Sequence, residues 1–163
     1  MRYFLILCIF VFSMLGSELG IDWRHNVSDA KEEAIAQKKP IILFLHSRSC
    51  FYCPKIIEDV LPNPKVKNFL EKNFIKLALD TSTGSDSIEE EVSDQAPPRF
   101  IVSITPAFIF MGPNEEKLAR NGKKHMIIYG FWTPEQLIKW GKDALKRFHR
   151  LYGKKYGLEE VYK

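Results

Sequence analysis

The chain has 163 residues, 45% of them hydrophobic and 27% charged, with a formal net charge of +4 at pH 7. This length suits one domain whose core is large enough to fold alone, and it leaves little room for a second domain. The positive charge is too weak to indicate a nucleic-acid partner.

The first 17 residues have the pattern of a secretory signal peptide. Arg2 gives a positively charged start, and an apolar run follows from Tyr3 to Leu15. The small residues Gly16 and Ser17 then offer a cleavage site. The apolar run is shorter than the roughly 20 residues that a spanning helix needs, although an uncleaved signal would act as a membrane anchor. We therefore expect residues 1–17 to be removed during export.

Predicted helices and strands alternate after the signal. Residues 21–24 have the composition of a short strand, and the following helix has Ser28 as its predicted N-cap and ends before Pro40. The continuous apolar run Ile41–Leu45 predicts a central strand that helices cover on both faces. The next helix is predicted to begin at the two cysteines that follow.

A further helix and strand complete the first half of the chain. The helix has Asn63 as its predicted cap and Pro64 in its first position, and Phe74–Asp80 predicts a second buried strand. Residues 81–99 are polar and contain Gly84 and the pair Pro97–Pro98, with room for one acidic helix over residues 88–95. We expect this segment at the surface.

The second half of the chain predicts a β-hairpin and a long helix. Ala107–Met111 has a strand pattern that ends in a turn at residues 112–114, and His125–Trp132 is predicted to pair with it. Thr133 has the position of a helix N-cap, and Gln136 completes a capping box. The apolar face of this helix consists of Leu137, Trp140, Ala144, Leu145 and Phe148.

The order of these elements predicts an α/β fold, with a central mixed β-sheet flanked by helices. We assign residues 18–150 to this domain and residues 151–163 to a basic C-terminal tail. Basic side chains outnumber acidic ones over residues 142–163. The plain interpretation is a solvated helix face and a loose tail, and the alternative is a docking patch for an acidic partner or for lipid head groups.

Cys50 and Cys53 are the candidate catalytic residues. Cys8 lies in the predicted signal, so these two are the cysteines of the mature protein, in a compartment where disulfides persist. A thiol attacks a disulfide only as its thiolate, and the unpaired N–H groups at a helix start stabilise that anion. With Cys50 at the helix start and Cys53 one turn later, Cys50 is predicted to attack and Cys53 to resolve.

Two other interpretations of the cysteine pair stay open. His46 is close enough in sequence to join a metal site, but a closed zinc site needs four ligands, and the remaining histidines do not come in pairs. Two thiolates suffice for Cu(I), which tolerates low coordination. A purely structural disulfide would close a short loop and stabilise the fold little. Our prediction is a redox-active pair with no metal and no cofactor.

Three blocks of the sequence, in this order, resemble the thioredoxin superfamily. They read KKPIILFLHSRSCFYC, PNPKVKNFLEKNFIKLALD and ITPAFIFM. The resemblance covers about residues 21–148, and it is to the secreted bacterial proteins that are similar to the C-terminal domain of the thiol reductase DsbD. It implies a thioredoxin-like fold and thiol–disulfide oxidoreductase activity.

The resemblance also implies a substrate site beside the cysteines. In the family, the proline that corresponds to Pro106 is cis and faces the cysteine pair. We therefore expect a cis Thr105–Pro106 bond where an extended substrate binds. Phe51 and Tyr52, between the cysteines, are the candidates for an apolar contact with that substrate.

The sequence departs from thioredoxin itself at two positions. Phe44 stands where thioredoxin has a buried aspartate that helps to move a proton, and Ser49 stands where it has a tryptophan. That proton relay is therefore absent. His46 and Arg48 are the nearest cationic candidates, and the plain interpretation of both is a solvated polar side chain.

These observations together predict a periplasmic thiol–disulfide oxidoreductase. The simplest form of this prediction is a reductase that receives its electrons from a membrane thiol carrier. Its expected partners are cysteine-containing substrate proteins, and it is expected to be a monomer that binds no nucleic acid. A disulfide oxidase or isomerase is the near alternative. A non-enzymatic module that holds Cu(I) through the same cysteines is the rival from another class.

Overall fold

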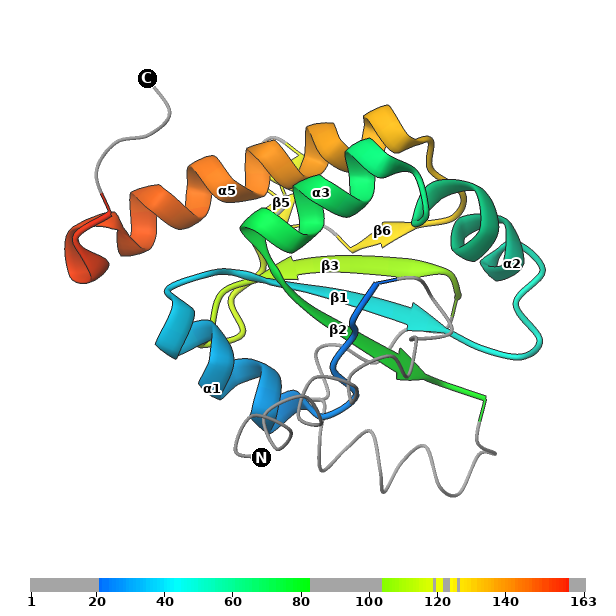
Figure 1. Ribbon diagram of the computed structural model, residues 1–163, viewed down its shortest axis with the longest axis horizontal. Coiled ribbons are helices and arrows are strands. Elements are labelled where there is room, and N and C mark those ends of the chain that lie inside the picture. The colour runs from blue at the N-terminus through cyan, green and yellow to red at the C-terminus, as the bar shows by residue number, and fades with distance from the viewer. Residues whose placement is uncertain (1–20, 83–103, 119, 122–123, 126, 159–163) are drawn as a thin grey trace, which may run out of the picture.

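The computed structural model describes residues 21–82, 104–118, 120–121, 124–125 and 127–158. Within them, helices cover both faces of a central β-sheet (Figure 1). Two predictions, the signal peptide over residues 1–17 and the acidic helix over residues 88–95, lie outside the described residues.

The described strands form one mixed sheet and one small ribbon. They are β1 (Ile41–His46), β2 (Ile75–Asp80), β3 (Ala107–Met111), β4 (Arg120–Asn121), β5 (Lys124–His125) and β6 (Ile128–Tyr129). The sheet has the order β2-β1-β3-β6, and β4 pairs with β5 separately. β1 is parallel to β2 and antiparallel to β3, and β6 is antiparallel to β3. The predicted mixed sheet and the central position of β1 are confirmed.

The described helices lie in two layers. They are α1 (Val27–Gln37), α2 (Cys53–Lys55), the π-helix η1 (Ile56–Val60), α3 (Pro64–Asn73) and α5 (Pro134–Tyr156). α1 lies on one face of the sheet, and the others lie on the opposite face (Figure 1). None of the described helices combines the length and the apolar character that crossing a bilayer requires.

β1 is buried on both faces because its side chains point alternately to each helix layer. Ile41, Leu43 and Leu45 pack in the core cluster that includes α1. Ile42 and Phe44 pack in the larger cluster, which includes residues of α3 and α5. The unbroken apolar run that predicts a central strand is therefore explained by two separate cores.

α1 begins earlier than the sequence predicts. Its N-cap is Asn26 rather than Ser28, because the Asn26 side-chain oxygen accepts hydrogen bonds from the N–H groups of Ser28 at 2.8 Å and Asp29 at 3.1 Å. Both residue types are good caps. The earlier start makes Val27 helical and buries it with Ala30 on the core face of α1.

The segment between β3 and α5 is less regular than predicted. Among the described residues of the predicted strand His125–Trp132, Ile128 and Tyr129 pair with β3, whereas His125 belongs to β5 and pairs with β4. Gly130 follows with φ of 87°, a conformation that favours glycine, and turns the chain away from the sheet. Thr133 then caps α5 in the reciprocal capping box that the sequence predicts.

α5 extends beyond the predicted domain boundary. It runs to Tyr156, so residues 151–156 are helical rather than part of a loose tail. Tyr152 is 6% exposed, and its ring stacks on that of Phe148 with 4.8 Å between centroids. The apolar spacing of the helix therefore continues for one more turn. Gly157, with φ of 61°, ends the helix.

The residues before α1 add to the outer edge of β2. The N–H of Arg24 donates to the carbonyl of Lys76 at 2.7 Å, and the N–H of Ala78 donates to the carbonyl of Arg24 at 2.8 Å. These bonds make one isolated parallel bridge, between Arg24 and Leu77. The strand predicted over residues 21–24 is reduced to this bridge.

Candidate active site

The cysteine loop begins where β1 ends. The chain turns after His46, and the N–H of Cys50 donates to the carbonyl of Ser47 at 3.2 Å. The N–H of Cys53 then donates to the carbonyl of Cys50 at 3.3 Å. These turns hold both cysteines just beyond the carboxyl end of β1, the edge where α/β sheets place their binding sites.

The helix at the cysteines begins later than the sequence predicts. Its first residue is Cys53, with Tyr52 as the cap, and Cys50 lies in the preceding turn. Pro54 explains the difference, because a proline has no N–H to donate to the carbonyl of Cys50 in the helical pattern. Cys50 therefore lies just before the N-terminus of the helical segment that α2 and η1 form, not in its first turn.

Cys50 and Cys53 are joined by a disulfide, with their Cα atoms 5.4 Å apart. Cys50 is 7% exposed and Cys53 is 3% exposed, so both are buried and Cys50 is the more accessible. This is the order that an attacking and a resolving cysteine require. Among the described residues, no group of three or more His, Cys, Asp and Glu side chains is arranged to hold a metal ion.

The loop before β3 lies against the cysteine loop. The hydroxyl oxygens of Thr105 and Ser47 are 2.9 Å apart and share a hydrogen bond. The Thr105–Pro106 peptide bond is cis, and Pro106 is buried. The carbonyl of Pro106 accepts a hydrogen bond from the N–H of Gly130 at 3.0 Å. The cysteine loop, the Thr105–Pro106 loop and the loop between β6 and α5 therefore lie together.

Exposed apolar side chains lie on or next to these three loops. Phe51 is 85% exposed and Tyr52 is 48% exposed, and their rings meet edge to face at 5.2 Å. Ile104, Tyr129 and Phe131 are also exposed. The ammonium group of Lys55, in α2, lies 5.8 Å from the centre of the Phe131 ring. We call Phe51, Tyr52, Ile104, Tyr129 and Phe131 the apolar rim.

Sequence reasoning identifies only the part of the rim that lies between the cysteines. It places Tyr129 and Phe131 in one predicted strand. In the structure Tyr129 is the outward-facing residue of β6 beside the buried Ile128, and Phe131 lies exposed in the loop after Gly130. The position of Ile104 directly before Thr105–Pro106 is the one signal that could have added it.

A buried ring occupies the position where the resemblance leads us to look for a carboxylate. Phe44 has 0% exposure, and its ring stacks on that of Phe108 with 4.8 Å between centroids. His46 lies on the same sheet face, with its ring centre 5.3 Å from that of Phe44. Burial lowers the pKa of His46, while the nearby Asp80 carboxylate opposes that shift. The half-buried imidazole is therefore biased towards its neutral form.

A polar network anchors the start of the cysteine loop to the end of β2. Asp80 pairs with His46 across the two strands and accepts hydrogen bonds from the N–H of Ser82, at 2.8 Å, and from its hydroxyl. The Ser82 hydroxyl oxygen accepts the N–H of Arg48, whose side chain is exposed. Burial opposes ionisation of Asp80, but the bonds from Ser82 hold its pKa below the usual range.

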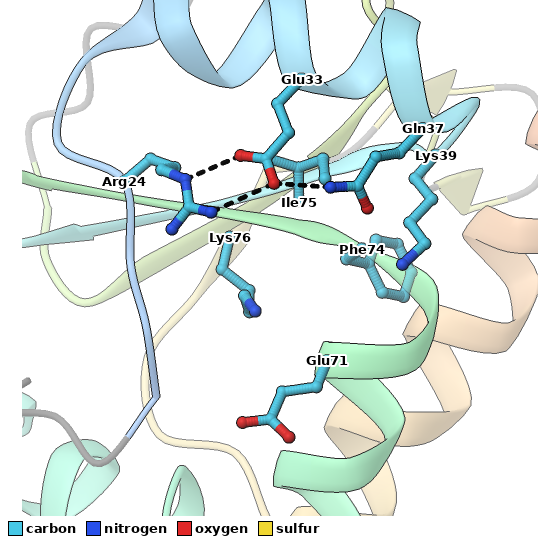
Figure 2. Close-up of a pocket in the computed structure, with 8 residues that line it drawn as sticks. All are labelled: Arg24, Glu33, Gln37, Lys39, Glu71, Phe74, Ile75 and Lys76. Atoms are coloured by element: carbon cyan, nitrogen blue, oxygen red, sulfur yellow. Dashed lines mark hydrogen bonds and ion pairs between the residues drawn. The ribbon is translucent and has the colours of Figure 1, made fainter. Parts of the chain in front are cut away.

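A small polar pocket of about 110 Å³ lies at the other end of the sheet (Figure 2). Arg24 binds the Glu33 carboxylate through two N–O contacts of 2.7 and 3.1 Å, and the Gln37 amide donates to Glu33 at 2.7 Å. The pocket is beside the first residues of β2, whereas the cysteines follow the last residue of the parallel strand β1. It is therefore separate from the candidate active site.

Comparison with known proteins agrees with this site. A family model described as thioredoxin-like matches residues 22–113, which contain the cysteine loop, the Thr105–Pro106 loop and strands β1 to β3. No curated protein matches the chain.

Solved structures share the fold at low sequence identity. A thioredoxin from Thermus thermophilus is similar with a TM-score of 0.59 and 21% identity, over 83% of this chain and 96% of that chain. A DsbH oxidoreductase has a TM-score of 0.56 and 20% identity, over 77% and 85%. The oxidised DsbD C-terminal domain from Neisseria meningitidis has a TM-score of 0.56 and 13% identity, over 76% and 99%.

The family match spans more than half of the chain and encloses the Cys50–Cys53 disulfide. The fold agrees with the match, since the mixed sheet and its two helix layers are shared with the solved thioredoxin. This chain therefore belongs to the thioredoxin-like family.

Proposed function

We propose that this protein reduces disulfides of substrate proteins in the bacterial periplasm. The observation that carries the proposal is the Cys50–Cys53 disulfide at the sheet edge, next to the Thr105–Pro106 loop and with the exposed Phe51 and Tyr52 of the apolar rim between its cysteines. Contiguous exposed apolar side chains mark a surface that binds other proteins. A redox pair within such a surface supports exchange with protein disulfides better than it supports a static cross-link.

The reaction moves two electrons from the reduced cysteine pair to the substrate. The Cys50 thiolate attacks one sulfur of the substrate disulfide, forms a mixed disulfide, and releases the other substrate sulfur as a thiolate that takes up a proton. Cys53 loses its proton and attacks the sulfur of Cys50. The Cys50–Cys53 disulfide forms, and the second substrate thiol leaves. The structure corresponds to this oxidised product, which a dithiol donor must reduce again.

The substrate is proposed to bind across the three loops. Phe51 and Tyr52 lie beside Cys50 and would contact apolar side chains of the substrate. The backbone around Thr105 and Pro106 would receive an extended segment next to the attacked disulfide. Cys50 is assigned the attack because it is the more exposed cysteine of the pair.

The signal pattern in residues 1–17 supports export. The compartment that the protein reaches then determines where its electrons come from. The periplasm is kept oxidising, so a reductase there needs electrons from outside that compartment. A membrane thiol carrier is the donor that meets this need. We assign the protein a monomeric state with cysteine-containing proteins as its substrates.

The test of the cysteine roles is a pair of trapping variants. Cys53→Ser should leave the first attack intact and block its resolution, so mixed disulfides with periplasmic proteins should accumulate on a non-reducing gel. Cys50→Ser is the matched control and should trap almost nothing. Equal trapping by the two variants, or trapping by Cys50→Ser alone, would overturn the assignment.

The direction of electron flow and the copper alternative need two further measurements. A reduction potential near the thioredoxin value of about −270 mV supports a reductase, and a value near about −120 mV would make the protein an oxidase. Metal-free protein that reduces insulin with dithiothreitol as the electron source supports the enzyme. Stoichiometric Cu(I) binding without turnover would identify a carrier instead.

A further inference from the structure

A row of cationic side chains follows the solvent-facing side of α5. Its members are separated by three or four residues and are all exposed: Lys139, Lys142, Lys146, Arg150 and Lys154. We call them the basic row. Residues at this spacing are neighbours on a helix surface, so the row is continuous over about 22 Å.

The basic row lies opposite the face that α5 buries. Each residue of an α-helix is rotated by about 100° from the previous one around the helix axis, so the five side chains of the row fall within a sector of about 120° around that axis. Leu137, Leu145 and Phe148 are buried on the other side of the helix. Figure 1 shows α5 along the outside of the molecule, with its first turn near α2 and its last turn far from it. The row therefore faces solvent along its whole length.

Neighbouring groups leave the charge of the row largely uncompensated. None of its five side chains forms an ion pair within the part of the chain that the structure describes. Asp143 lies within the same sector, and Glu135 lies at its N-terminal end. Like charges at this spacing destabilise a helix slightly. An anionic partner would relieve this repulsion, and the relief would add to the binding free energy.

We propose that the basic row binds the surface of an anionic phospholipid bilayer. Four of its five members are lysines, and all five lie on one side of a single helix, so a flat surface can meet them at once. Protein interfaces are depleted in lysine and are organised around aromatic or apolar anchors. Leu151, the exposed apolar side chain of α5, lies outside the row. Diffuse attraction to many lipid head groups needs no such anchor.

Binding along the row leaves the candidate active site accessible. The apolar rim lies at the N-terminal end of α5, where Phe131 contacts Lys55, and contributes no residue to the row. The protein would therefore lie on the membrane surface with its cysteines free to meet substrates. The inference itself does not depend on the redox proposal, because it uses no property of the cysteines.

The test compares binding of the full-length chain to vesicles of phosphatidylglycerol and of phosphatidylcholine by co-sedimentation. The ratio of the two partition coefficients cancels the contribution of the apolar residues 3–15, which is common to both lipids. Each basic residue near an anionic surface contributes roughly fivefold to partitioning. The double variant Lys146→Gln/Arg150→Gln should therefore lower the ratio about 25-fold, and roughly 0.5 M NaCl should largely abolish the preference.

The matched control removes the same charge from another helix. Lys65 and Lys72 are exposed on α3, and Lys65→Gln/Lys72→Gln should change the ratio less than about threefold. Equal losses in the two double variants would show that net charge alone determines binding, which overturns the assignment to α5. Equal partitioning of the wild type into both lipids would overturn it as well, and would leave an acidic protein as the partner to seek.

Discussion

His46 is the last residue of β1, and its half-buried ring lies between Phe44 and the strand partner Asp80. Burial disfavours the charged imidazolium and lowers the pKa of His46, and the carboxylate of Asp80 opposes that shift. Electrostatic repulsion from His25 also lowers the pKa of His46. The ring therefore stays neutral in the folded protein at pH values where the unfolded chain already binds a proton.

We expect His46→Gln to weaken the pH dependence of stability between about pH 7 and about pH 5. Below the unfolded pKa of about 6.5, the unfolded chain binds a proton at His46 that the folded protein does not. The free energy of unfolding of the wild type therefore falls as the pH falls. Glutamine cannot take up that proton, and urea unfolding at a series of pH values measures the difference.

Asp80→Asn is the matched variant for this measurement. Asp80 itself changes charge below about pH 3.8, because its pKa is lowered, so its own titration lies outside the window. Its removal takes away the group that raises the pKa of His46. The loss of stability towards low pH should then be steeper than in the wild type. Parallel curves for all three proteins would contradict the burial argument.

At the scale of the elements, the start of α5 rests on a reciprocal capping box. The N–H of Thr133 donates to the side-chain oxygen of Gln136 at 2.9 Å, and the N–H of Gln136 donates to the hydroxyl of Thr133 at 3.3 Å. Each bond satisfies a donor that the first turn of a helix would otherwise leave unpaired. α5 provides the longest helix of the described fold, so its cap affects the whole domain.

Thr133→Ala should lower the free energy of unfolding by about 1 kcal/mol, because the first turn loses its side-chain acceptor. The measurement is a shift of the urea midpoint at constant slope. Thr133→Ser keeps the hydroxyl and should remain close to the wild type. An unshifted midpoint for Thr133→Ala would mean that packing of Leu137 and its neighbours alone determines where α5 begins.

The elements that the sequence predicts correctly are those with local causes. The apolar run Ile41–Leu45 and the caps Asn63 and Thr133 act within a few residues, and the structure has each of them in place. The late start of the helix at Cys53 also has a local cause, which is Pro54. A proline is compatible with the first turn of a helix, so the sequence alone does not show that the helix begins after Cys50. The apolar rim depends instead on how three distant loops meet, so only its Phe51 and Tyr52 follow from the sequence.

At the scale of the whole molecule, the last turns of α5 belong to the main core. Tyr152 is buried between Phe148 and Tyr156, with ring centres 4.8 and 5.3 Å away, and its hydroxyl accepts a hydrogen bond from the Asn114 amide at 3.1 Å. Asn114 lies in the loop after β3. The C-terminal end of the helix is therefore held against both the core and a loop.

Tyr152→Ala should destabilise the protein by about 3 kcal/mol or more, because truncation of a buried aromatic ring leaves a cavity. Tyr152→Phe keeps the ring stack and removes the bond from Asn114, which should cost about 1 kcal/mol. Chemical denaturation measures both changes. A loss below about 0.5 kcal/mol for Tyr152→Ala would show that residues 151–156 contribute little to the domain.

The bridge at Arg24 also determines which edge of the sheet other chains can reach. An open strand edge offers its N–H and carbonyl groups as a template for another strand, and this is a common route to aggregation. The Lys76 carbonyl and the Ala78 N–H already bond to Arg24, so this stretch of β2 cannot add a foreign strand. Arg24 follows the predicted cleavage site at Ser17 closely. Processing that removed it would produce a protein with intact cysteines and an uncovered, adhesive edge.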